Sequence, residues 1–172
     1  IDVGGPTMVR AAAKNFKNVL VVVDPKDYIK VKEAIKFGSD TIDFRQTLAA
    51  KAFQHLSFYD SQIARHLNRK KFPEEIAIPG RFSFKLRYGE NPHQEGAVYT
   101  EPNTDSPISG LKKIAGKDLS GTNYTDIAAG LESVRVFKEP CVVVIKHNSP
   151  CGIALGKSIK EASINTEVFD PT

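Results

Sequence analysis

Residues 141–152, CVVVIKHNSPCG, combine an apolar run with two ionisable residues and a turn. The four apolar residues at 142–145 follow one another without interruption, which is typical of a strand buried on both faces of a parallel sheet. The strand stops at Lys146 and His147, and residues 148–150 (NSP) then form a turn. The pattern predicts an ammonium and an imidazole at the carboxyl edge of a sheet, where open α/β sheets bind their ligands.

The chemistry of this pair is specific. Lysine carries a permanent cation near neutral pH, whereas histidine gains or loses its proton there. Lys146 and His147 together could stabilise a developing oxyanion and move a proton at one place. This pattern therefore favours a catalytic site.

The composition is that of an ordinary globular protein. The chain has 172 residues, of which 41% are hydrophobic and 26% charged, enough for one domain or two small ones. No apolar run approaches the roughly 20 residues of a membrane span, and the N-terminus (IDVGGPT) does not have the pattern of a signal peptide. Cys141 and Cys151 lack metal-binding spacing, so we expect reduced thiols of a cytoplasmic protein and no metal site.

The net charge of +4 raises the question of nucleic-acid binding. Lys and Arg are scattered along the chain, and the one basic run, 65–71, lies where a helix should end. Complementarity to the helix dipole explains that run more simply than a nucleic-acid partner does. We therefore expect anionic small molecules as ligands, with neither nucleic acid nor membrane as a partner.

The first half of the chain predicts alternating strands and helices. Residues 1–5 (IDVGG) resemble the end of a strand entering a glycine turn, and a helix follows from Pro6 to Asn15. The free N–H groups of such a turn can bind phosphate, but the signal is weak and a tight strand-to-helix connection is the favoured explanation of the glycines. Residues 18–23 (NVLVVV) predict a second buried strand. Next come a turn or short helix at Pro25, a helix over 28–37, and an amphipathic helix of about 27 residues capped by Ser39 or Asp40.

A linker rich in proline and glycine, residues 73–80, separates this half from the next. Alternating residues predict a strand over 81–86, which leads into the octapeptide 87–94 (RYGENPHQ). Its density of hydrogen-bonding groups, including an arginine suited to phosphate, favours a binding site; a polar turn remains the alternative. Residues 97–100 predict another strand.

A helix follows residues 119–123 (LSGTN), with Asn123 or Thr125 as its cap. The strand at 141–145 then completes a strand-helix-strand unit, which is a right-handed crossover if the two strands are parallel. A last helix over 158–168 begins with capping-box spacing between Ser158 and Glu161.

Four segments together resemble a known family. IDVGGPTMVRAAAKN, RYGENPHQ, LSGTNYTD and VVIKHNSPCGIALG occur here in the order found in the bifunctional purine-biosynthesis enzymes that combine AICAR transformylase with IMP cyclohydrolase. The resemblance implies an α/β fold: residues 1–72 as the C-terminal part of a methylglyoxal-synthase-like cyclohydrolase domain, and residues 81–172 as the start of a cytidine-deaminase-like transformylase domain. It also implies that the chain is an internal fragment.

The resemblance assigns roles by position. In the cyclohydrolase half, Lys14 would transfer a proton during ring closure, and Asp2, Val3 and Gly4 would line the nucleotide. In the transformylase half, His147 would take the proton of the AICAR amino group, and Lys146 would stabilise charge during formyl transfer. The AICAR-binding residues would be Arg87, Tyr88, His93 and Asn123.

The resemblance further implies 10-formyltetrahydrofolate as co-substrate, K+ as a candidate ion, and a cytoplasmic homodimer acting on AICAR, FAICAR and IMP. Three residues depart from the family pattern: Gly121, where many relatives have tyrosine, Ser163 and Phe169. Glycine at 121 would leave the Asn123 loop less ordered. A non-catalytic module that binds nucleotide phosphate and a dimer-assembly fragment remain alternatives to an enzyme.

Overall fold

The computed structural model describes residues 1–104, 106, 108 and 110–166. The chain divides into two compact units, Ile1–Pro79 and Gly80–Thr172, and each is described by itself. The boundary falls within the segment 73–80, and no helix or strand is found from Asn68 to Gly80.

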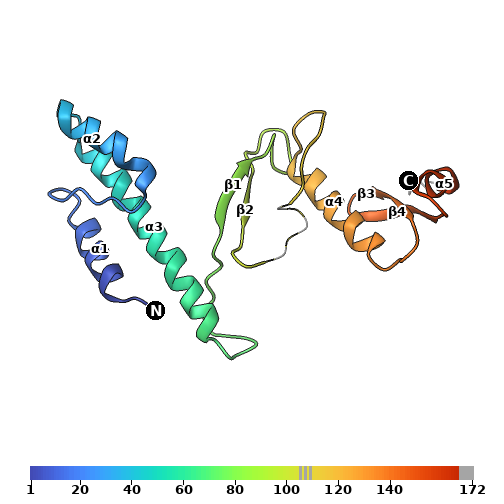
Figure 1. The fold of residues 1–172 in the computed structure, drawn as a ribbon, viewed down its shortest axis with the longest axis horizontal. Helices are drawn as coiled ribbons and strands as arrows, with labels where there is room; N and C mark the ends of the chain where they lie inside the picture. Colours follow the sequence, from blue (N-terminus) through green and yellow to red (C-terminus); the bar gives the residue numbers. More distant parts are fainter. Residues whose placement is uncertain (105, 107, 109, 167–172) are drawn as a thin grey trace. The chain divides into compact units, whose positions relative to one another are not determined.

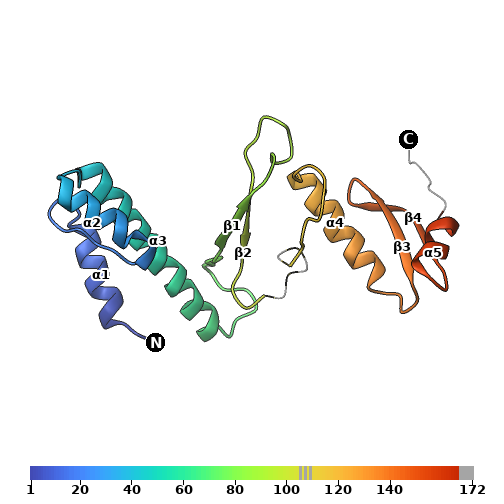
Figure 2. The same ribbon diagram turned by 45° about the horizontal axis from the view of Figure 1, so that its top comes forward.

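The first unit is helical. It contains α1 (Gly4–Lys14), the 3-10 helix η1 (Pro25–Asp27), α2 (Tyr28–Phe37) and α3 (Ile42–Leu67). Helix α1 packs along α3, as Figures 1 and 2 both show. A small core joins these helices to the segment after α1; its buried members are Ala13, Val21, Ala49 and Ala52.

The helices of this unit largely follow the predicted periodicity. Helix α2 has the predicted bounds and ends at Gly38, whose positive φ of 63° suits glycine. Helix α3 has 26 residues, and Leu48, Ala52 and Leu56 of its predicted stripe are buried. Its cap is Thr41, which accepts a hydrogen bond from the Phe44 N–H (3.3 Å), so the prediction of residue 39 or 40 was wrong.

The two strands predicted in this unit are not formed. The segment 1–3 has no regular structure, helix α1 begins at Gly4, and residues 18–23 run without strand pairing. A strand needs a neighbour for its backbone hydrogen bonds, and none of the described segments pairs with either stretch. The apolar character of 18–23 serves packing instead, because Val21 is buried in the core between the helices.

The second unit contains two antiparallel hairpins and two helices. Strand β1 (Arg81–Lys85) pairs with β2 (Ala97–Thr100), and β3 (Cys141–Lys146) pairs with β4 (Ser149–Leu155). Helix α4 (Gly121–Val134) packs on β3, and α5 (Ile159–Asn165) packs on both β3 and β4 (Figure 2). The unit therefore has both α and β structure, in small sheets.

The predicted parallel crossover was wrong. Strands β2 and β3 belong to different sheets, and β3 pairs with the segment that follows it. Only two residues, His147 and Asn148, separate the paired residues Lys146 and Ser149. A connection of two residues can join only antiparallel strands, because a parallel pair needs a crossover of a dozen residues or more. Strand β3 is accordingly half-buried and not fully buried.

The last helix confirms the predicted cap. The Ser158 side chain accepts a hydrogen bond from the Glu161 N–H (3.2 Å), and α5 begins at the next residue. Ser163 lies in α5 with an exposed side chain. The predicted end of this helix at residue 168, and Phe169, lie outside the described residues.

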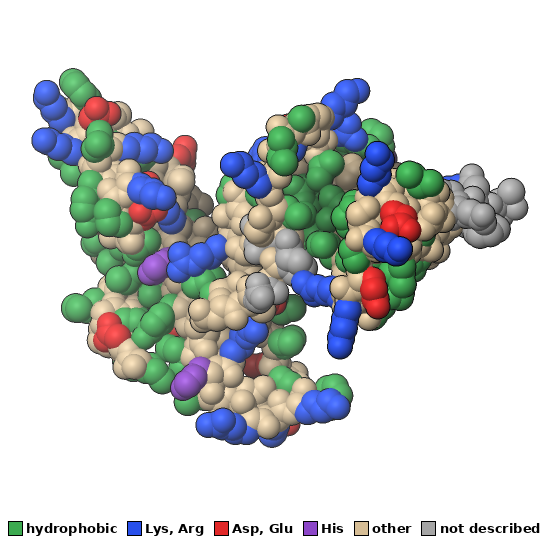
Figure 3. All heavy atoms as spheres, turned by 45° about the vertical axis from the view of Figure 1, so that its right-hand side comes forward, with side chains coloured by type: hydrophobic (Ala, Val, Ile, Leu, Met, Phe, Trp, Pro, Cys, Tyr) green, Lys and Arg blue, Asp and Glu red, His purple; other side chains and the backbone are tan. Residues whose placement is uncertain are grey.

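The described surface includes large apolar side chains. Phe72 is 82% exposed and Ile114 is 94% exposed. Figure 3 shows such side chains, in green, lying between lysine and arginine side chains on the visible face. Within the described part of the chain, none of the helices combines the length and apolar character needed to cross a membrane.

Candidate functional site

The predicted site residues of the first unit lie at the two ends of α1. Asp2 and Val3 precede the helix and Gly4 begins it, whereas Lys14 is its last residue and is exposed. Ten steps of 1.5 Å separate Gly4 from Lys14, or about 15 Å along the helix axis. The structure therefore does not bring Lys14 together with the other three residues.

The carboxylate of Asp2 occupies the N-terminal end of α1. The Gly5 N–H donates a hydrogen bond to Asp2 Oδ1 (3.4 Å), and a Cβ on Gly5 would lie 2.5 Å from Asp2 Oδ2. A carboxylate at this place satisfies the helix dipole and repels a second anion. The geometry favours a tight connection over a phosphate-binding turn at these glycines.

Tyr59 of α3 holds Asp2 in place. The Asp2 N–H donates to Tyr59 Oη (2.7 Å), and this hydroxyl donates to the Asp2 carbonyl oxygen (3.2 Å). Asp2 and Tyr59 line a cavity of about 330 Å³ together with His55. In the sequence, Tyr59 belongs to the apolar residues spaced three and four apart along α3, and His55 lies on or beside them, so their approach to Asp2 could not be predicted from that pattern.

In the second unit, Arg87 and Tyr88 form a contacting pair. Arg87 Nη2 donates to Tyr88 Oη (3.0 Å), and the guanidinium carbon lies 4.7 Å from the centre of the Tyr88 ring. This cation–π arrangement orients the guanidinium, which remains exposed. Arg87 is therefore a pre-oriented cation, suited to a phosphate or carboxylate.

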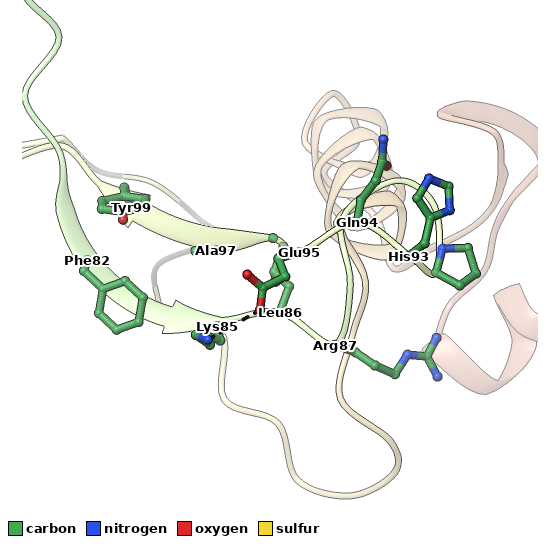
Figure 4. A pocket seen from close by; sticks show the side chains of 11 residues that line it. Phe82, Lys85, Leu86, Arg87, His93, Gln94, Glu95, Ala97 and Tyr99 are labelled. Atoms are coloured by element: carbon green, nitrogen blue, oxygen red, sulfur yellow. Dashed lines mark ion pairs between the residues drawn. The ribbon is translucent and has the colours of Figure 1, made fainter.

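Arg87 and His93 both line a cavity of about 350 Å³ next to β1 and β2. Figure 4 shows their side chains at one end of this cavity, with Phe82 and Tyr99 at the other. An ion pair between Lys85 and Glu95 (3.7 Å), marked by the dashed line, lies between the two ends. The end with Arg87 and His93 therefore offers a cation and an imidazole to an anionic ligand.

Much of the polarity of the octapeptide is used within the loop. The Gly89 N–H donates to the Gln94 carbonyl (2.8 Å), and the Asn91 N–H donates to Gln94 Oε1 (2.8 Å). These bonds form the polar turn considered as the alternative. Because the turn is closed by Gly89, Asn91 and Gln94, the side chains of Arg87 and His93 remain exposed.

The octapeptide is fastened to the start of α4. The Arg87 N–H donates to the Leu119 carbonyl, and the Gly121 N–H donates to the carbonyls of Tyr88 and Gly89, each at 3.0 Å. A Cβ on Gly121 would lie 3.1 Å from the Gly89 oxygen. The expectation that Gly121 leaves this region less ordered stays a prediction; in the structure the missing side chain allows the two backbones to bond closely.

Asn123 belongs to the N-terminal cap of α4. The cap residue is the fully buried Ser120, so the prediction of Asn123 or Thr125 as cap was wrong. Asn123 Oδ1 accepts hydrogen bonds from the Ser120 N–H (3.0 Å) and the Ser120 hydroxyl (2.9 Å). Since the capping box uses the side-chain oxygen of Asn123, its NH₂ group is the part suited to a ligand.

Lys146 and His147 lie at the tip of the second hairpin. Lys146 is the last residue of β3 and is half-buried, whereas His147 is exposed in the turn. His147 and Asn148 have φ values of 51° and 64°, so both are left-handed, as in a type I′ turn. The left-handed conformation costs roughly 1 kcal/mol for a residue with a side chain. The ammonium and imidazole that were predicted at the carboxyl edge of a parallel sheet therefore lie at the tip of an antiparallel hairpin.

Helix α4 connects the two groups of this unit. Asp126 Oδ1 accepts the Asn148 N–H (2.8 Å), and Asp126 lies three residues after Asn123, on the same face of the helix. The first two turns of α4 therefore bond to the Arg87–Tyr88 loop at one end and to the His147 turn further along. Asp126 was not predicted as a site residue; its spacing of three residues from Asn123 was the available signal.

Charge around Arg87 extends to Asp118. A hydrogen bond from Lys113 holds the pKa of Asp118 below its usual value, and the charge of Arg87 adds to the effect. Asp118 therefore stays ionised beside the cationic loop. Across the residues that the structure describes, no group of three or more His, Cys, Asp or Glu side chains is arranged to bind a metal ion.

Comparison with known proteins connects these residues with a family. The family described as AICARFT/IMPCHase bienzyme matches residues 12–172. Proteins named bifunctional purine biosynthesis protein PurH are similar over nearly the whole chain. Those of Oceanobacillus iheyensis and Clostridium kluyveri are each 46% identical over 100% of the chain, and that of Aquifex aeolicus is 44% identical over 99%.

The chain spans only about a third of the length of these relatives: 34% for the Oceanobacillus protein and 35% for the other two. The match nevertheless includes all four segments that carry the resemblance. The chain therefore belongs to the AICARFT/IMPCHase bienzyme family.

Proposed function

We propose that this chain contributes parts of two active sites to a bifunctional enzyme that catalyses the last two steps of purine biosynthesis. Residues 81–172 would form part of the AICAR transformylase site, and residues 1–72 part of the IMP cyclohydrolase site. The observation that carries the proposal is the arrangement around α4, which bonds to both the Arg87–Tyr88 loop and the His147 turn. Family membership supports the choice of reaction.

Binding of AICAR would use the cationic end of the 350 Å³ cavity. The Arg87 guanidinium, oriented by Tyr88, is the group suited to the phosphate. His93 and the NH₂ group of Asn123 would add hydrogen bonds to the nucleotide. Arg87 and His93 lie on a loop bonded to the start of α4, and Asn123 lies in α4 itself, so their positions would be set before substrate arrives.

Formyl transfer requires the AICAR 5-amino group to attack the formyl carbon of 10-formyltetrahydrofolate. A bond forms between that nitrogen and the formyl carbon, and the bond from the carbon to N10 of the folate breaks. His147 would accept the proton lost by the amine, and Lys146 would stabilise the negative charge on the formyl oxygen. Protonation of N10 completes the products, FAICAR and tetrahydrofolate.

Ring closure of FAICAR to IMP releases water, and the proposal gives Lys14 the proton transfer. Asp2, Val3 and Gly4 would contact the nucleotide. Since about 15 Å of helix separates Gly4 from Lys14, the two ends of α1 would serve different parts of the site. The support for this half is the similarity of the whole chain to its relatives, together with the IDVGG and AAAKN segments that carry the resemblance.

The proposed working form is a cytoplasmic homodimer that acts on AICAR, FAICAR and IMP, with neither nucleic acid nor membrane as a partner. K+ belongs to the same proposal, and activity in K+ compared with Na+ buffers tests it. The described residues offer no acidic cluster for a divalent metal.

The decisive experiment uses the full-length protein that contains this chain. We expect His147→Ala to abolish formyl transfer and leave ring closure intact, and Lys14→Ala to do the reverse. His66→Ala and Lys32→Ala, which remove exposed side chains of α3 and α2, are matched controls. Formyl transfer that survives His147→Ala would show that the assignment is wrong.

A second measurement separates this proposal from the non-catalytic alternatives. The 172-residue chain is titrated with AICAR, and formyl transfer is then assayed with 10-formyltetrahydrofolate. AICAR binding that Arg87→Ala abolishes supports the substrate site. If the full-length protein also binds AICAR without turnover, it is a nucleotide-binding module and the proposed enzyme is excluded.

A further inference from the structure

The turn that carries His147 holds two residues with side chains, and no glycine, at positive φ. Lys146 and Ser149 are paired across the hairpin, and the two residues between them both have positive φ, 51° and 64°. Two-residue turns of this kind prefer asparagine followed by glycine, because glycine adopts positive φ without steric cost. Here the first position is histidine and the second is Asn148. Histidine and asparagine occur at positive φ more often than most residues other than glycine, but the conformation still has a steric cost, which support from outside the hairpin can offset.

Asp126 provides that support. Its Oδ1 accepts the backbone N–H of Asn148 at 2.8 Å, across 22 residues of sequence. The carboxylate is half-buried on α4, and a hydrogen bond to an ionised acceptor is roughly twice as strong as a neutral one. The bond reaches the backbone of the residue next to His147, so it restrains the peptide that sets the direction of the imidazole.

The same helix also restrains the substrate-binding loop. Asn123, three residues before Asp126, closes the cap of α4, and Gly121 bonds to the carbonyls of Tyr88 and Gly89. We propose that Asp126 is a positioning residue for formyl transfer, which holds the His147 turn in register with the Arg87–Tyr88 pair. This inference rests on the proposed function and deepens it.

The carboxylate acts through the Asn148 N–H and not on the reacting atoms. Loss of the bond frees the turn to leave the left-handed conformation, so His147 spends less time where it can accept the amine proton. The Arg87–Tyr88 pair is fastened to α4 by other hydrogen bonds and stays in place. Removal of Asp126 should therefore lower kcat while the KM for AICAR is unchanged.

The test compares four variants of the full chain and of the full-length enzyme. Asp126→Ala removes the acceptor, and Asp126→Asn keeps a carbonyl oxygen at the same position. Asp126→Ala combined with Asn148→Gly restores the turn by another route, because glycine favours positive φ. Glu132→Ala is the matched control, since it removes an acidic side chain from the same helix, where Glu132 pairs with Arg135 (3.0 Å).

Two readouts are measured. Amide hydrogen exchange of Asn148 in the 172-residue chain reports the bond directly, and steady-state kinetics of the full-length enzyme report its effect. We expect Asp126→Ala to lower the protection of this amide about tenfold and kcat by a similar factor, as the loss of one charge-assisted hydrogen bond predicts. Asp126→Asn keeps a neutral acceptor, so it should lose less of both than Asp126→Ala, and Asn148→Gly should restore kcat in the double variant.

Two results would overturn the inference. One is an unchanged kcat in Asp126→Ala despite faster exchange at Asn148. The other is a lower kcat that the Asn148→Gly change fails to restore, because Asp126 would then act directly. Absence of formyl transfer in the unmodified enzyme would instead overturn the proposed function, so the two failures are distinguishable.

Discussion

Replacement of Gly121 by alanine tests the closest backbone contact of the second unit. A Cβ at this position would lie 3.1 Å from the Gly89 oxygen and 3.2 Å from its carbonyl carbon, well inside the usual 3.5–4.0 Å separation of carbon atoms. Gly89 has little room to withdraw. Its N–H is bonded to the Gln94 carbonyl (2.8 Å), and a Cβ on Gly96 would lie 3.0 Å from the Gly89 Cα on another side.

The magnitude follows from three contributions. Overpacking of a constrained contact costs roughly 1–3 kcal/mol. A displaced loop also weakens the bond from the Gly121 N–H to Tyr88 and Gly89, worth about 1 kcal/mol. The helix propensity of alanine returns at most about 1 kcal/mol, and less in the first turn. We therefore expect Gly121→Ala to destabilise the second unit by about 1–3 kcal/mol, and Gly121→Tyr to do so by more.

The assay is urea unfolding, followed by NMR through amides of α4 and β3 so that the second unit is observed alone. Gly130→Ala in the same helix is the control. Its Cβ would meet Ile145 Cγ1 at 3.4 Å and Val143 Cγ1 at 3.7 Å, which are ordinary contacts. Helix propensity should then stabilise this variant by about 0.5–1 kcal/mol. If Gly121→Ala stabilised the unit as Gly130→Ala does, the close contact with Gly89 would not exist.

Three further predictions concern the ion pairs and caps. A hydrogen bond from Lys51 (2.8 Å) lowers the pKa of Asp24 below 3.8, and the same pairing raises the pKa of Lys51 above 10.5. Lys51→Met should therefore lower Tm at pH 5–9. This difference in Tm from the unmodified chain should become smaller as the pH falls through the lowered pKa of Asp24 or rises through the raised pKa of Lys51, and a difference that stays constant with pH would contradict the prediction. Ser120→Ala removes the hydroxyl of a buried capping box and should lower the free energy of unfolding in urea by about 1–2 kcal/mol. An unchanged free energy of unfolding would show that α4 does not begin at this cap. Thr41→Ala should cost about 0.5–1 kcal/mol, whereas Thr41→Ser keeps the hydroxyl that accepts the Phe44 N–H and should cost little; equal losses would exclude the cap.

Local patterns in the sequence predicted the helices well. The bounds of α2, the length of α3 and the Ser158 cap depend on residues three or four positions apart, so they can be read from a short window. The pattern was less reliable at the starts of helices. The start of α4 illustrates this, since Ser120, Asn123 and Thr125 are all chemically able to cap, and only the structure distinguishes them.

Strand pairing and site assembly were decided by tertiary structure. The apolar runs at 18–23 and 142–145 look alike in sequence, yet one is unpaired and the other lies in a hairpin, because pairing depends on a partner elsewhere in the chain. The motif residues and the family could be recognised from the sequence alone. That Gly121 touches Gly89, and that Asp126 holds Asn148, could not, because these contacts join segments more than 20 residues apart whose approach is set by packing and not by local propensity.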